Sequence, residues 1–178
     1  MRQVLTVMKE KQQRYEALVH AFHGDIYRYA YWLTRDPAVA EDIVQETFLR
    51  AWRSLDSLKD EKSAKSWLIT IVRRENARRF ERKQLETVDI DDVPVADEAF
   101  HAGNGDDTEE LRILIARLPA DYREPLILQL IFGYSGEEIA EQLSLNKNTV
   151  MTRLFRARNQ LRDMLESDSA HQRGRHNG

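Results

Sequence analysis

Residues 118–165 read LPADYREPLILQLIFGYSGEEIAEQLSLNKNTVMTRLFRARNQLRDML, and this stretch decides the fold of the second half of the chain. Within it, Ser135 and Glu138 have the Ser-x-x-Glu spacing of a capping box, which predicts a short helix directly after the serine. The SLN at 144–146 fits a tight turn, and its Asn can cap a longer helix that begins at Lys147. The stretch therefore predicts a helix-turn-helix.

The longer helix of this motif has two different faces on a helical wheel. One narrow arc is apolar and is expected to be buried: Val150, Leu154, Ala157, Leu161 and Leu165. The opposite arc carries Asn148, Thr152, Phe155, Arg156 and Asn159. A large apolar residue among polar and basic ones is unusual for a face that meets only solvent. A DNA-recognition helix explains it, because Arg and Asn reach base edges while apolar side chains meet thymine methyl groups.

Charge along the chain is strongly segregated, although the formal net charge is only −3. Five basic residues and no acidic one lie between Lys147 and Arg162, which favours a phosphate backbone as partner over an amphipathic helix with Arg for solubility. Residues 62–84 hold eight basic and two acidic residues, and residues 85–110 hold ten acidic residues with no Lys or Arg. The net charge alone argues against a nucleic-acid binder, but it averages over two basic segments separated by an acidic one, and this segregation is the informative electrostatic feature.

Scarce glycine and proline, seven and four residues, and the lack of strand-period alternation predict an all-α fold. We expect two small helical domains, at 1–84 and 109–166, joined by a flexible acidic linker at 85–108. The tail at 167–178 is predicted to be disordered. In the first domain, helices are expected over 12–34, from Asp36-Pro37 to about residue 55, and over 66–83, with a polar loop at 58–65.

The second of these helices has an inner stripe of Ala40, Val44, Phe48, Ala51 and Leu55. Its opposite stripe is Asp42, Gln45, Glu46, Leu49 and Arg53. Leu49 at the centre of that polar face is either a single exposed leucine, which is common, or the centre of a docking face for a protein partner.

The third helix is expected to pack Trp67, Leu68, Ile71 and Val72 inward and to project its cations outward. The outward residues are Arg73, Arg74, Arg78, Arg79, Arg82 and Lys83. This face is either a nucleic-acid surface or a solvated cationic one.

Several classes of function lack their sequence features. With no cysteine there is no disulfide and no thiolate metal site, and His20 and His23 have no further ligand nearby, so no metal and no cofactor are expected. No phosphate-cradling glycine loop or nucleophile elbow is present, so the protein is not expected to be an enzyme. No apolar run is long enough for a membrane span, and the first residues do not resemble a signal peptide, which predicts a soluble cytoplasmic protein.

Two segments resemble a known family. IYRYAYWLTRDPAVAEDIVQETFLRAWRSL and SAKSWLITIVRRENARR are similar to the second conserved region of bacterial RNA polymerase sigma factors, and the helix-turn-helix stretch is similar to their fourth. Having these two regions with a short linker resembles the extracytoplasmic-function (ECF) class. The resemblance implies an alternative sigma factor that binds core RNA polymerase and promoter DNA, reads the duplex −35 element and the melted −10 element, and is often held inactive by an anti-sigma factor.

The resemblance also implies roles for individual residues. It implies a polymerase-docking face at Asp42, Gln45, Glu46, Leu49 and Arg53. It implies −10 DNA contacts from Lys62, Lys65, Arg73, Arg74, Arg78 and Arg79. It implies −35 DNA contacts from Lys147, Asn148, Met151, Thr152, Phe155, Arg156 and Arg158. Many relatives have Gly and Arg where this chain has Asn148 and Met151, so an unusual −35 preference is expected. The alternative from the residues alone is a helix-turn-helix repressor or activator that binds DNA tightly without polymerase.

Overall fold

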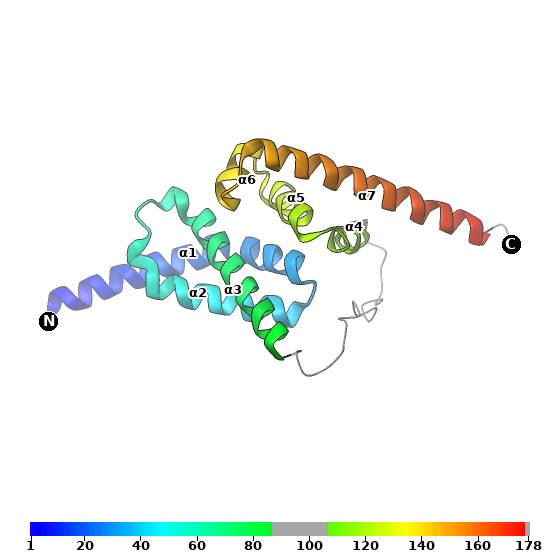
Figure 1. The fold of residues 1–178 in the computed structure, drawn as a ribbon. Helices are drawn as coiled ribbons and strands as arrows, with labels where there is room; N and C mark the ends of the chain where they lie inside the picture. Colours follow the sequence, from blue (N-terminus) through cyan, green and yellow to red (C-terminus); the bar gives the residue numbers. More distant parts are fainter. Residues whose placement is uncertain (87–106, 177–178) are drawn as a thin grey trace. The chain divides into compact units, whose positions relative to one another are not determined.

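A computed structural model describes residues 1–86 and 107–176, and the regular elements in these two ranges are helices (Figure 1). The chain divides into two compact units, residues 1–103 and 104–178. The predicted all-α fold with two helical domains is confirmed. The greater part of the predicted acidic linker, residues 87–106, lies outside the described residues.

In the first unit, α1 (Arg2–Thr34), α2 (Pro37–Ser54) and α3 (Ala64–Glu86) pack against one another in all three pairs. The 3₁₀ turns Leu55–Ser57 and Glu61–Ser63 connect α2 to α3. The segment predicted as a polar loop is thus partly helical. It also contributes to the core, because apolar side chains at its two ends, Leu58 and Ala64, are buried.

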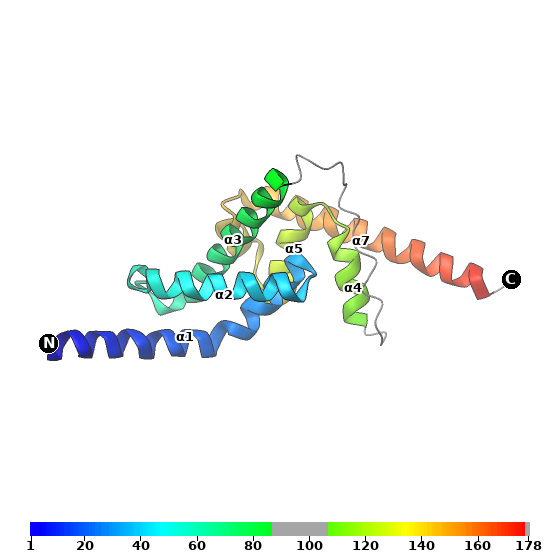
Figure 2. The ribbon, with the colours of Figure 1, turned by 90° about the horizontal axis from the view of Figure 1, so that it is seen from below.

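Helix α1 begins ten residues before the predicted start at residue 12 and ends where predicted. Residues 2–11 contain neither glycine nor proline, so nothing in them ends the helix. This N-terminal part extends past α2 and α3 of the same unit (Figure 2). Its side chains from Arg2 to Glu10 are exposed, so the prediction failed because no buried stripe marks these turns.

The predicted start of α2 is confirmed. Oδ1 of Asp36 accepts hydrogen bonds from the backbone N–H groups of Ala38 at 2.9 Å and Val39 at 3.2 Å. Pro37 occupies the first helical position, where its missing N–H removes no helical bond. Arg35, in the left-handed region at φ 55°, ends α1 and reverses the chain.

One face of each helix forms the core of the first unit. Its buried members include Leu18, Ile26, Tyr29, Ala30, Ala40, Ile43, Val44, Phe48, Ala51, Leu68, Ile69 and Val72. On α3 the prediction is partly wrong: Trp67 and Ile71 are half-buried, whereas Ile69 and Glu75 are buried. The buried arc is shifted because α3 packs against both α1 and α2 rather than against one neighbour.

The second unit contains α4 (Asp107–Ala116), α5 (Ala120–Phe132), α6 (Gly136–Leu143) and α7 (Lys147–His176). Helices α4, α5 and α6 each pack against α7. Gly133 ends α5 at φ 64°, a left-handed conformation that glycine adopts without steric cost.

The helix-turn-helix forms from α6, the turn and α7, as predicted. The backbone N–H of Glu138 donates to Ser135 Oγ at 3.2 Å, and the backbone N–H of Ser135 donates to Glu138 Oε2 at 2.7 Å. In the turn, Ser144 is left-handed at φ 53° and the N–H of Leu145 reaches the carbonyl of Ala140 at 2.9 Å. Asn146 then caps α7.

We expect Ser135→Ala to lower the free energy of unfolding of the second unit by about 1 kcal/mol, because it removes the acceptor at the start of α6. Urea unfolding followed by circular dichroism measures the change. Ser169→Ala is the control, since the hydroxyl of Ser169 is exposed and bonds only a carbonyl of its own helix. An equal loss in both variants would contradict the capping role.

The tail prediction is wrong for residues 167–176, which continue α7 as helix to His176. The hydroxyls of Ser167 and Ser169 bond the carbonyls four residues earlier, both at 2.8 Å, and no proline interrupts the segment. Asp168 also lies 3.9 Å from Arg117, which follows α4. Polar composition was therefore insufficient evidence for disorder, because a helix that is already nucleated propagates at low cost.

Candidate nucleic-acid interface

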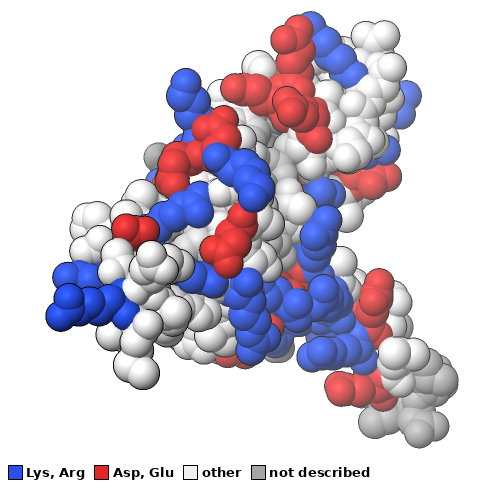
Figure 3. All heavy atoms as spheres, turned by 90° about the vertical axis from the view of Figure 1, so that its left-hand side faces the viewer, with Lys and Arg blue, Asp and Glu red and all other residues white. Residues whose placement is uncertain are grey.

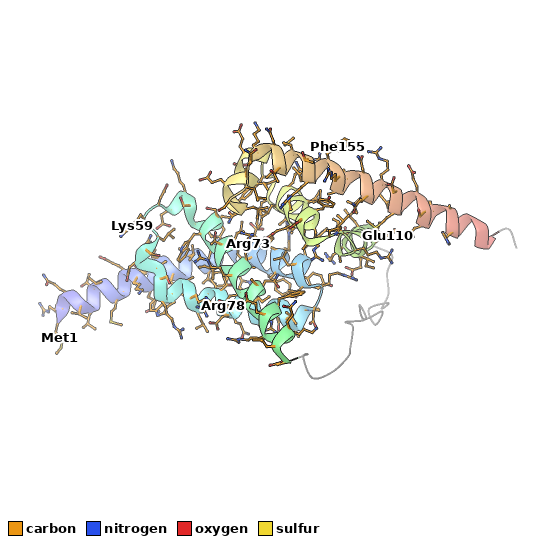
Figure 4. All side chains as sticks on the ribbon, viewed as in Figure 1. Met1, Lys59, Arg73, Arg78, Glu110 and Phe155 are labelled. Atoms are coloured by element: carbon orange, nitrogen blue, oxygen red, sulfur yellow. The ribbon has the colours of Figure 1, made fainter. Side chains whose placement is uncertain are left out.

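Helix α7 presents the sharpest candidate surface. The apolar arc of the wheel is confirmed for Val150, Leu154, Ala157 and Leu161, which are buried. All seven predicted −35 residues are exposed: Lys147, Asn148, Met151, Thr152, Phe155, Arg156 and Arg158. Phe155 is 65% exposed, and its side chain points away from the other helices of the unit (Figure 4). Leu165 was predicted to belong to the buried arc, but this is wrong, since the residue is 42% exposed.

Three arginines of α7 are held by side chains of α5. Arg156 donates to the hydroxyl of Tyr122 at 3.4 Å, and Arg158 donates to Oε1 of Gln129. These contacts orient the two guanidinium groups. The sequence predicts that both arginines lie on the helix surface, but it does not predict the direction of their side chains.

The third arginine, Arg153, lies 3.8 Å from Asp121, also on α5. No spacing rule links residues that lie about 30 positions apart, so the supporting role of α5 was not foreseen. Only the packing of α5 against α7 brings these partners together.

The first turn of α7 is tied to the first turn of α6. Nζ of Lys147 donates to the Glu137 carboxylate at 2.7 Å. This hydrogen bond, followed by the Coulomb attraction of the same ammonium group, lowers the pKa of Glu137. Met151 Sδ would lie 2.7 Å from a Cβ at Gly136, so the glycine makes room for this side chain. Lys147 and Met151 thus have partners within the motif as well as an exposed surface.

Burial shifts two further titrating groups of this unit. Desolvation lowers the pKa of Arg123, whose Nη1 donates to the carbonyl of Ala116 at 3.1 Å and ties the end of α4 to α5. Desolvation, assisted by the Glu138 carboxylate, raises the pKa of Tyr134.

The first unit has its own cationic helix face on α3. Arg74, Arg78 and Arg79 are exposed, as is Lys62 before the helix, while Arg73 and Lys65 are half-buried. Figure 4 shows Arg73 and Arg78 along α3 and Lys59 on the segment that precedes it. On the face drawn in Figure 3, Lys and Arg side chains gather in patches with Asp and Glu between them.

A small hollow of about 200 Å³ lies between the C-terminal end of α2 and α3. Arg74 and Arg78 line it together with Trp67, which is half-buried here rather than packed in the core. Glu75 forms part of its wall and is the buried acid of this unit. Glu75 was not among the residues of this helix that were predicted to face inward or outward.

The outer face of α2 has the predicted composition. Asp42, Gln45, Leu49 and Arg53 are exposed and Glu46 is half-buried, with Leu49 at 50% exposure. Two of its acids contact arginines: Asp42 lies 3.6 Å from Arg79 of α3, and Glu46 lies 3.3 Å from Arg50 of α2. The face therefore combines an apolar centre with a charged rim, the composition of a protein-docking surface.

No group of three or more His, Asp or Glu side chains in 1–86 and 107–176 is placed to hold a metal ion. None of the helices described is both long and apolar enough to cross a bilayer.

The class that these features define is a two-unit helical DNA-binding protein with a helix-turn-helix in its second unit. Comparison with known proteins is specific about the family. The sigma-70 region 2 family model matches residues 18–86, and the sigma-70 region 4 model matches residues 108–161.

Known relatives match nearly the whole chain. It is 34% identical over 167 residues to the RNA polymerase sigma factor SigV of Bacillus subtilis (strain 168), covering 90% of this chain and 98% of that one. It is 30% identical over 167 residues to the ECF RNA polymerase sigma factor SigC of Mycobacterium tuberculosis (strain CDC 1551 / Oshkosh), covering 92% and 90%.

Solved structures agree with these matches. The sigma factor RpoE of Bartonella quintana, crystallised with the anti-sigma factor NepR, matches with a TM-score of 0.74 at 30% identity, covering 90% of this chain and 99% of that one. CnrH, solved with the cytosolic domain of CnrY, has the same fold, with a TM-score of 0.66 at 24% identity and coverage of 88% and 90%. The chain belongs to the ECF family of RNA polymerase sigma factors, and as such it is an alternative sigma factor that directs promoter-specific transcription initiation.

Proposed function

We propose that three surfaces of this sigma factor have separate roles in transcription initiation. The outer face of α2 docks on core RNA polymerase, the cationic face of α3 holds the melted −10 element, and the outer face of α7 reads the duplex −35 element. The observation that carries this assignment is the exposure of Phe155 among polar and basic side chains on the second helix of a helix-turn-helix. Such a face fits a major groove better than it fits solvent.

The −35 surface consists of the seven exposed α7 residues from Lys147 to Arg158. Arg156 is the best candidate for a base contact, because Tyr122 holds its guanidinium from one side and leaves donors for a base edge. Thr152 and Asn148 lie on the same face, one turn and two turns before it respectively, and can also reach base edges. Phe155 supplies an apolar contact for a thymine methyl group.

The −10 surface consists of Lys62, Lys65, Arg73, Arg74, Arg78 and Arg79. Single-stranded DNA is held by cations that follow its backbone and by aromatic or apolar surfaces under its bases. The arginines of α3 supply the first, and the half-buried Trp67 beside them supplies a ring for the second. Because core polymerase tethers both units to one promoter, neither unit needs to bind DNA tightly by itself.

We expect Arg156→Ala to weaken discrimination at one −35 base pair by about 1–3 kcal/mol, as loss of a bidentate base contact does. Holoenzyme transcription from a library of −35 variants measures the ranking of base pairs. Arg162→Ala is the matched control, because it removes the same charge from the same helix two turns later. The control is expected to lower activity on all variants equally, and an unchanged ranking in Arg156→Ala would refute the base contact.

Several further properties belong to this proposal. The protein acts by binding alone, with no covalent chemistry of its own, and it works in the cytoplasm, where polymerase and promoter DNA meet. An anti-sigma factor is a proposed partner, supported by the Bartonella quintana relative that was crystallised with one. Co-purification of the tagged chain from its own cells, with and without stress, tests that partner.

A further inference from the structure

Glu75 is a buried carboxylate in the middle of the cationic helix α3. Its side chain is only 9% exposed, although neighbouring positions of the helix carry exposed arginines. Burial of a lone charge is strongly unfavourable, so a buried acid requires cations that compensate it. Neither the fold of α3 nor the polymerase-docking role of α2 explains why a charge occupies this core position.

Two arginines compensate Glu75 from two helices. Arg50 of α2 forms an ion pair with Oε1 of Glu75, and Nη1 of Arg78 lies 3.3 Å from the same oxygen. Arg50 also lies 3.3 Å from Glu46, which satisfies part of its charge on the α2 side. The carboxylate is therefore fixed by the core and by Arg50, while Arg78 is its outermost partner.

Arg78 differs from Glu75 in exposure. Its side chain is 44% exposed, so one edge of the guanidinium meets Glu75 and the rest faces solvent beside the hollow of α3. An ordinary exposed pair three residues apart on a helix would hold Arg78 weakly, because water and salt screen it. Burial of the acid reduces that screening, so this ion pair holds the guanidinium near Glu75 more firmly than an exposed pair would.

We infer that Glu75 is a positioning residue for the −10 surface: it fixes the guanidinium of Arg78 in the orientation that receives the DNA strand. The inference rests on the proposed −10 role of α3 and deepens it. A long arginine side chain that is ordered before DNA arrives loses less conformational freedom on binding. Glu75 itself does not touch DNA, since its carboxylate would repel phosphate.

If Glu75 has this role, removal of its charge should have the opposite effect on promoter opening from the one that electrostatic repulsion alone predicts. Loss of a negative charge near DNA should strengthen binding, because repulsion of phosphates falls. If Glu75 positions Arg78, Glu75→Gln should instead slow open-complex formation, by roughly two- to tenfold. Glu81→Gln is the matched control, because Glu81 is an exposed acid on the same helix and its substitution changes the net charge by the same amount. The control should leave the rate unchanged or raise it.

The experiment uses holoenzyme reconstituted from the full chain and core polymerase, on a promoter mapped by its transcription start. Permanganate reactivity of thymines in the −10 element reports duplex opening. Glu75→Leu is the second variant, because leucine has a similar volume, and because Arg50 and Arg78 are both partly exposed and keep access to water when the carboxylate is removed. Both Glu75 variants should show the same slow opening even where their unfolding transitions match the wild type.

A double-mutant cycle with Arg78→Ala decides whether Glu75 acts through Arg78. We expect Glu75→Gln to add no further loss in the Arg78→Ala background. Wild-type or faster opening in folded Glu75→Gln or Glu75→Leu, or fully additive losses in the cycle, would overturn the inference. If Arg78→Ala alone has no effect, the −10 assignment of Arg78 fails and the inference fails with it. A loss in Arg78→Ala with none in Glu75→Gln refutes only the positioning role.

Discussion

Leu49→Asp is expected to abolish binding of the sigma factor to core RNA polymerase without unfolding it. Leu49 is half exposed at the centre of the α2 face, so an aspartate there stays solvated in the free protein. In the docked state it would carry an unpaired charge into an apolar contact, at a cost of at least about 2 kcal/mol, which is roughly thirtyfold in affinity. Equilibrium binding of labelled protein to core polymerase measures the loss.

Leu5→Asp is the matched control for this experiment. Leu5 is also an exposed leucine of the first unit, near the start of α1 rather than on α2. We expect its affinity for core polymerase and its helical circular dichroism signal to equal those of the wild type. Full transcriptional activity of Leu49→Asp would show that the α2 face is not the docking surface.

Leu154→Ala is expected to lower the unfolding free energy of the second unit by about 2–5 kcal/mol. Leu154 is completely buried beneath the −35 surface, so truncation leaves a cavity between α7 and the helices packed on it. A unit of this size has a stability on the order of 5 kcal/mol, so much of that stability is removed. The free energy of unfolding measured in urea and the level of transcription from a −35-dependent promoter should both decrease.

Leu154→Met tests whether residue 154 acts through core packing or through contact with DNA. Methionine conserves most of the side-chain volume, and the loss should stay below about 1.5 kcal/mol. The order of −35 preferences should be unchanged in this variant, since residue 154 faces the core and not the DNA. A change of preference in Leu154→Met at wild-type stability would contradict the assignment of the buried and exposed faces of α7.

Local sequence rules predicted the features that local chemistry determines. The caps at Asp36 and Ser135 and the turn at 144–146 follow from hydrogen bonds between residues at most five positions apart, and the structure contains them. The two faces of α7 were predictable because a helix in contact with a core on one side has a clear apolar arc.

Features set by tertiary packing could not be predicted from a wheel. Helix α3 touches two neighbours, so its buried arc moved to include Ile69 and Glu75. Glu75 lies among outward cations in the sequence, and no local pattern indicated that it would be buried beside Arg50 of another helix. The contacts of Tyr122 and Gln129 with α7 arginines likewise depend on how α5 packs.

Helix ends were the other source of error. No side chain is buried in residues 2–10 of α1 or in residues 165–171 of α7, so hydrophobic periodicity did not detect these turns. In both cases the chain continues a helix that is already stabilised by its packed part, since extension adds a hydrogen bond per residue without new nucleation.

We expect both units to select promoters only when core RNA polymerase holds them together over DNA. The most direct measurement is transcription by core polymerase from the organism that encodes the chain, on genomic DNA, with start sites mapped with and without the sigma factor. We predict new transcripts whose start sites share one −35 and one −10 sequence, while the free chain binds the same promoters with little sequence specificity. Tight, specific promoter binding by the free chain, with no new start sites when core polymerase is added, would contradict the claim.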